Sequence, residues 1–82
     1  MISLAEIARA LDCKYYGNGK LTFTSPAEPL KANIHQIAIA IDQKFQIQLF
    51  ETNAKAAIIN ETFDWRSTNL EGVIITKKSK II

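Results

Sequence analysis

The feature that most constrains the fold is a five-residue run, IAIAI at 37–41, which is apolar at every position. A strand with one face in solvent alternates apolar and polar residues, so this run is typical of a strand buried on both faces. Two shorter apolar runs follow, AAII at 56–59 and VII at 73–75. Strands buried on both faces lie in sheets that helices cover from both sides. The sequence therefore predicts an α/β fold with a small mixed sheet flanked by helices.

The segment between the first two apolar runs predicts a helix. Asp42 directly follows the first run and is a favoured N-cap residue for a helix over about 43–52. Phe45 and Leu49 would lie one turn apart on that helix. The order strand, helix, strand predicts a right-handed crossover between parallel strands.

The N-terminal residues predict another helix, over about 4–11. Ser3 and Glu6 have the spacing of a capping box, in which each side chain accepts a hydrogen bond from the other residue's amide. The apolar residues of the segment recur at the spacing of one helical face. They are Leu4, Ile7, Ala8 and Leu11.

A glycine-rich turn follows this helix. Gly17-Asn18-Gly19 lies between strand-like residues, and both residue types tolerate positive φ, so the pattern predicts a β-hairpin. Leu21 and Phe23 would then face one side of their strand. Pro26 and Pro29 predict a loop, which continues through residue 35.

Size, charge and cysteine content limit the classes of protein. The 82 residues predict one domain, 1–82, and the net charge of +2 does not indicate a nucleic-acid partner. No run approaches the ~18 apolar residues of a membrane span, and the N-terminus lacks a signal-peptide pattern, so we expect a cytoplasmic location. Cys13, the only cysteine, is expected to be a buried thiol.

The motifs of the commonest catalytic and cofactor sites are absent from the sequence. It has neither common glycine-rich phosphate-binding fingerprint, and one histidine with one cysteine gives no zinc pattern. His35 stands alone in the predicted loop, and the lysines at 77, 78 and 80 are typical of a solvated face. We therefore expect no cofactor and no metal, and predict a binding or accessory domain.

Read from end to end, the chain resembles a known domain. The order runs through SLAEIARAL, YYGNGKLTFTSPAEPL, IAIAIDQKF, NAKAAII, DW and GVII. This order is similar to the N-terminal, uridine-binding domain of UDP-3-O-acylglucosamine N-acyltransferases of lipid A biosynthesis, in the form found in alphaproteobacteria. That domain is similar in fold to the N-terminal UDP-binding domain of Mur ligases.

The resemblance implies a function for a longer protein. Such enzymes are cytoplasmic homotrimers that transfer a 3-hydroxyacyl chain from acyl carrier protein to the 2-amine of UDP-3-O-acylglucosamine. Their catalytic histidine lies in a left-handed β-helix of hexapeptide repeats, which this chain lacks, and His35 does not match it. The resemblance thus implies that this chain carries no catalytic residue and binds the UDP end of the substrate.

The resemblance also assigns nucleotide-binding residues within IAIAIDQKF. The family segment LSFxxNPKY places an aromatic residue and a tyrosine on the two sides of the uracil ring, with an asparagine at its edge. The matching positions here are Ile39, Phe45 and Asp42, and Lys44 matches the family lysine. Phe45 keeps an aromatic face, Ile39 offers only apolar contact, and ionised Asp42 can only accept hydrogen bonds. Lys44 could contact the diphosphate.

Two other functions are consistent with the residues. Replacement of the family aromatic and asparagine favours a structural or interaction domain that has lost nucleotide binding. The front domain of a Mur-type ligase is the third candidate, although its DSR and GxxxDGH stretches are absent.

Overall fold

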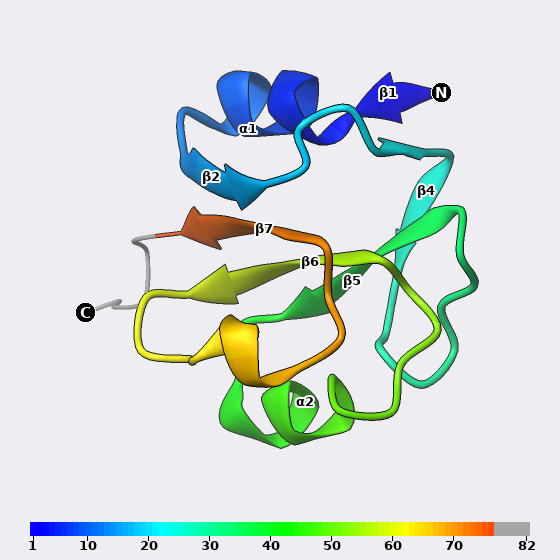
Figure 1. Ribbon diagram of the computed structural model, residues 1–82, viewed down its shortest axis with the longest axis vertical. Coiled ribbons are helices and arrows are strands. Elements are labelled where there is room, and N and C mark those ends of the chain that lie inside the picture. Colours follow the sequence, from blue (N-terminus) through cyan, green and yellow to red (C-terminus); the bar gives the residue numbers. More distant parts are fainter. Residues whose placement is uncertain (77–82) are drawn as a thin grey trace.

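The computed structural model describes residues 1–76 (Figure 1). The three lysines predicted to form a solvated face, at 77, 78 and 80, lie outside the described residues. Residues 1–76 form two α-helices, a short 3-10 helix and seven strands. They are β1 (Ile2–Ser3), α1 (Leu4–Leu11), β2 (Lys14–Gly17), β3 (Thr22–Phe23), β4 (Ser25–Ala27), β5 (Gln36–Ala40), α2 (Gln43–Gln48), β6 (Ala56–Asn60), η1 (Trp65–Ser67) and β7 (Gly72–Thr76).

The principal sheet has five strands in the order β2-β7-β6-β5-β4. The neighbours from β4 to β7 are parallel, whereas β2 is antiparallel to β7. A second sheet consists of β1 and β3 alone, paired antiparallel. The α/β class, the mixed sheet and the parallel connection through α2 are therefore confirmed.

Both faces of the central strands are buried, as the apolar run predicted. One face of the sheet packs with α2 and η1, and the other packs with α1. Successive side chains of a strand point to opposite faces, so β5 contributes to both cores. The α2-side core includes Ala38, Ala40, Leu49, Ala57, Ile59 and Val73, and the α1-side core comprises Leu4, Ala8, Phe23, Ile37, Ala56 and Ile74.

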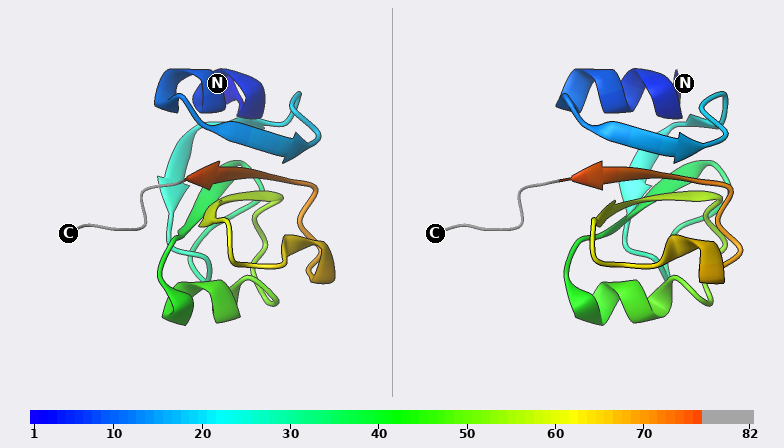
Figure 2. Two further views of the ribbon diagram at one scale, coloured as in Figure 1. Left: turned by 90° about the vertical axis from the view of Figure 1, so that its left-hand side faces the viewer. Right: turned by 60° about the vertical axis from the view of Figure 1, so that its left-hand side comes forward.

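The two helices lie at opposite ends of the molecule, with the sheet between them (Figures 1 and 2). Helix α1 contacts β2 and β7, whereas α2 contacts β5, near the other end of the sheet. Each face of the sheet is therefore only partly covered by its helix. The uncovered part of each face forms a concavity, and the two concavities are described below.

The predicted β-hairpin at Gly17-Asn18-Gly19 is wrong. The residues on the two sides of this turn belong to different sheets, because β2 pairs with β7 and β3 pairs with β1. Gly17 has a φ of +91°, and the amide of Asn18 donates to the Glu71 carbonyl oxygen at 2.9 Å, which continues the contact between β2 and the start of β7. The turn therefore carries the chain from one sheet to the other.

Helix α1 begins at the predicted capping box. The amide of Glu6 donates to Ser3 Oγ at 3.1 Å, and the amide of Ser3 donates to Glu6 Oε1 at 2.9 Å. The hydrogen bond that the Ser3 amide donates to the carboxylate lowers the pKa of the Glu6 carboxyl. The helix spans Leu4–Leu11 as predicted, and Leu11, the last residue of its apolar face, is 51% exposed. The helix ends there, since Asp12 adopts the left-handed conformation with a φ of 58°.

Two further predictions need correction. Helix α2 ends at Gln48, whereas the prediction continued to residue 52, because the next amides bond three residues back in a series of turns. Cys13 is only partly buried and not a core thiol, since it follows the end of α1 and lines an open groove. Phe23 is buried in the α1-side core.

Candidate functional site

The junction of β5 and α2 contains three of the four residues that the family resemblance assigns to the nucleotide. Asp42 is the N-cap of α2, and its carbonyl oxygen accepts from the amides of Phe45 at 3.0 Å and Gln46 at 3.1 Å. The prediction that Asp42 is the N-cap is therefore confirmed, although its side chain makes no capping hydrogen bond. The exposed Asp42 carboxylate is therefore open to solvent or to a ligand.

Two side-chain amides hold this junction in place. Gln46 Nε2 and Asn60 Nδ2 each donate to the Ile41 carbonyl oxygen at 3.0 Å. Gln46 is 6% exposed, and Asn60 Oδ1 accepts from the Thr62 amide and hydroxyl. Neither residue was predicted from the sequence to have this role. Two features of the sequence could have indicated them. Asn60 is a polar residue directly after the apolar run AAII, and Gln46 is a glutamine beside Phe45 in α2.

The structure does not bring Ile39 to Phe45. Ile39 pairs with Ile58 in register and lies on the α1 face, whereas Phe45 packs against the α2-side core. Asp42, Lys44 and Phe45 do lie together, with Lys44 Nζ 5.1 Å from the centroid of the Phe45 ring.

Ile39 instead lines an apolar groove on the uncovered part of the α1 face. The groove has a volume of about 770 Å³ and lies at the carboxyl ends of β5 and β7. Its lining residues are Leu11, Asp12, Cys13, Ile39, Ile41, Ile58 and Thr76. The groove is mainly aliphatic, so it is suited to apolar contact.

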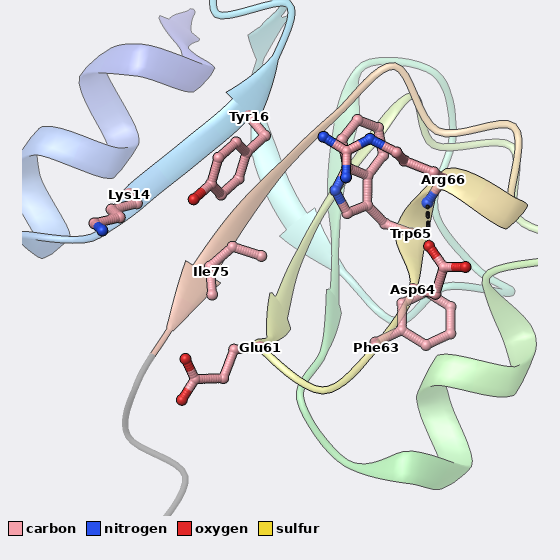
Figure 3. Close-up of a pocket in the computed structure, with 8 residues that line it drawn as sticks. All are labelled: Lys14, Tyr16, Glu61, Phe63, Asp64, Trp65, Arg66 and Ile75. Atoms are coloured by element: carbon pink, nitrogen blue, oxygen red, sulfur yellow. Dashed lines mark hydrogen bonds between the residues drawn. The ribbon is translucent and has the colours of Figure 1, made fainter.

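A second concavity, the Tyr16–Trp65 pocket, occupies the uncovered part of the α2 face (Figure 3). Its volume is about 330 Å³, and its lining residues are Lys14, Tyr16, Glu61, Phe63, Asp64, Trp65, Arg66 and Ile75. Figure 3 shows Tyr16 and Trp65 on the two sides of β7. This pocket was not predicted from the sequence.

The pocket combines aromatic rings with charged groups of both signs. The Arg66 guanidinium lies 5.1 Å from the centroid of the Trp65 ring. Lys14, Glu61, Asp64 and Arg66 are exposed, and none of them forms an ion pair with another residue in the range 1–76. The pocket therefore offers hydrogen-bond donors and carboxylate acceptors that the described residues do not neutralise.

Two further kinds of site have no structural support in the part of the chain that the structure describes. Among residues 1–76, no group of three or more histidine, cysteine, aspartate or glutamate side chains is placed to hold a metal ion. Neither described helix has the length and apolarity that crossing a membrane would require.

The chain was compared with known proteins. No protein-family model matches the chain. The chain is 34% identical over 79 residues to a protein of Ruegeria pomeroyi named UDP-3-O-acylglucosamine N-acyltransferase. The match includes 96% of this chain but only 22% of that protein. The chain is thus related to a part of an acyltransferase that is several times longer.

Proposed function

We propose that this chain is the N-terminal, UDP-binding domain of a UDP-3-O-acylglucosamine N-acyltransferase of lipid A and lipopolysaccharide biosynthesis. The observation that carries the proposal is the 34% identity over 79 residues, which extends across almost the whole α/β domain. In this proposal the full-length protein is a cytoplasmic homotrimer that receives its acyl group from acyl carrier protein. Catalysis belongs to another domain, and this domain holds the UDP end of the sugar nucleotide.

Lys44 is the residue of the assigned set best placed to contact the diphosphate. It is exposed at the start of α2, and the Phe45 ring lies beneath its ammonium. Such a cation–π contact positions the ammonium without neutralising its charge. The free Asp42 carboxylate beside it is an acceptor for a ribose hydroxyl or for the uracil N–H.

Titration of the chain with UDP and with UDP-GlcNAc tests this proposal. We expect both ligands to bind and Lys44→Ala to raise Kd by about fivefold, the size of one exposed charge contact. Lys20→Ala is the matched control, since it removes the same charge in the turn after β2, and we expect it to leave Kd unchanged. Absence of UDP binding at millimolar concentration would contradict the proposal.

A structural or interaction domain is the second candidate function. The replacement of the family aromatic residue by Ile39 and of the family asparagine by Asp42 favours it. In that case the chain would bind neither UDP nor UDP-GlcNAc in the same titration.

A further inference from the structure

We propose that Gln46 and Asn60 are positioning residues of a nucleotide site at the β5–α2 junction, and that they act through the Ile41 carbonyl group. The inference rests on the proposed function for its ligand, a uridine nucleotide. It goes beyond that function because it identifies side chains that set the affinity without touching the ligand.

The Ile41 carbonyl group lies where the chain leaves the sheet. The pairing register of β5 with β6 ends one residue earlier, and Asp42 is already the N-cap of α2. Two side-chain amides donate to this carbonyl oxygen, Gln46 Nε2 and Asn60 Nδ2, each at 3.0 Å. A carbonyl oxygen has two lone pairs, so both of its acceptor positions are used.

Fixing this oxygen fixes the backbone from which the Asp42 side chain projects. The peptide group between Ile41 and Asp42 is planar, so its carbonyl oxygen and Asp42 Cα belong to one rigid unit. The helix holds the other side of Asp42, whose carbonyl oxygen accepts from the Gln46 main-chain amide at 3.1 Å. Both peptide groups of Asp42 are therefore held, while its carboxylate is exposed and makes no capping hydrogen bond.

The burial of Gln46 indicates that its side-chain amide serves this contact. The residue is 6% exposed, and in the part of the chain that the structure describes it is the one polar residue that is buried. Burial of an amide costs free energy unless the amide is hydrogen-bonded, whereas an apolar side chain would fill the same space without that cost. The position therefore favours the hydrogen bond to Ile41, and not core packing, as the role of Gln46.

Thr62 sets the orientation of the second amide. Its main-chain amide and its hydroxyl donate to Asn60 Oδ1 at 3.1 Å and 2.7 Å. The main-chain N–H can only donate, so the side-chain oxygen of Asn60 must face it and Nδ2 must face the Ile41 carbonyl. Asn60 is the last residue of β6. It thus ties the junction to the neighbouring strand, whereas Gln46 ties it to the helix.

This hydrogen-bond network borders an open concavity at the carboxyl end of β6. The concavity has a volume of about 480 Å³, and its lining includes Gln43, Gln46, Asn60 and Thr62. Open α/β sheets bind ligands outside the carboxyl ends of their strands, which is where the network lies. A side chain on an ordered backbone loses less conformational entropy when it binds, so the two amides lower Kd through Asp42.

Isothermal titration calorimetry with UDP tests the role of Gln46. Gln46→Met keeps the length of the side chain and removes the hydrogen bond, so we expect it to raise Kd about fivefold, the size of one net hydrogen bond. Gln48→Met is the matched control, since it makes the same exchange in the same helix, and we expect it to change Kd less than twofold. Unchanged affinity in Gln46→Met would overturn the inference, while the proposed function would stand.

A double-mutant cycle with Asp42→Ala separates positioning from a general effect on stability. If Gln46 acts through Asp42, Gln46→Met should raise Kd much less once the Asp42 carboxylate has been removed. A merely structural role would give the same factor in both backgrounds, and that result would also overturn the inference.

Asn60 provides a second test that does not depend on a core position. Asn60 is half-buried, and Asn60→Leu removes its donor to Ile41 without adding a charge that would repel a diphosphate. We expect Kd to rise about fivefold, and we expect the control Asn53→Leu, at an exposed site, to change Kd less than twofold. Equal affinities of these two folded variants would contradict the inference. If the wild-type chain binds no UDP, the proposed function itself fails.

Discussion

Replacement of Gly17 by alanine should destabilise the domain, whereas the same replacement of Gly19 should not. Both glycines lie in the same turn. Gly17 has a φ of +91°, and a Cβ built on it would lie 2.4 Å from the Glu71 carbonyl oxygen and 2.7 Å from Gly72 Cα. Those atoms belong to the backbone of the neighbouring segment at the start of β7. They can move only if β2 separates from β7.

The expected magnitude follows from three terms. Holding alanine at this positive φ costs about 1–3 kcal/mol, and loss of the hydrogen bond from Asn18 to Glu71 costs about 1 kcal/mol more. The lower entropy of the unfolded chain offsets about 0.4–1 kcal/mol. The net loss of about 2 kcal/mol is a substantial fraction of the ~4–12 kcal/mol expected for a domain of 82 residues.

Urea denaturation followed by circular dichroism measures the difference. With an m-value of about 1 kcal/mol/M, Gly17→Ala should lower the midpoint by about 2 M. A Cβ on Gly19 would meet only ring atoms of Tyr15, an exposed side chain that can move away. Equal midpoints for the two variants would refute the reasoning that ties Gly17 to the pairing of β2 with β7.

Two further predictions concern the helices. Leu49 at the end of α2 is 2% exposed, so Leu49→Ala should lower the free energy of unfolding by about 2–5 kcal/mol. Ile47 is 66% exposed, so the control Ile47→Ala should change that free energy by less than about 0.5 kcal/mol. Urea midpoints that agree for these two variants would contradict the assigned packing of α2. Hydrogen bonds from Ser3 lower the pKa of Glu6 in the folded protein, so their stabilisation is complete above the ordinary value of 4.5 and is lost as the pH falls through the lowered pKa. Unfolding midpoints between pH 6 and pH 3 should therefore depend on pH less in Glu6→Gln than in the wild type, and equal dependence would show that the capping box contributes nothing.

The elements with strong local signals were predictable from the sequence. The run at 37–41 correctly predicted a strand buried on both faces, and the capping box correctly predicted the start of α1. Both signals depend on residues close together in the chain. The hairpin failed because the partner of β2 is β7, more than fifty residues further along, and turn residues carry no information about so distant a strand.

The candidate site was predictable only in part. The alternation of side chains along β5 predicts which face of the sheet each residue lies on, and Ile39 accordingly lines the groove on the α1 face. The Tyr16–Trp65 pocket joins β2, the connection after β6, and β7, three segments that come together only in the tertiary structure. Its residues have no mutual spacing in the sequence that could have been recognised.

The composition of the outer strands bears on how the domain avoids self-association. An outer strand with free amide and carbonyl groups can template the addition of a strand from another molecule, which is a route to aggregation. At one side of the sheet, β4 has only three residues, and its central residue is Pro26, which has no amide hydrogen to donate. At the other side, β2 begins with the charged Lys14. The sheet therefore resists growth at both sides, by a missing donor at β4 and by a charge at β2.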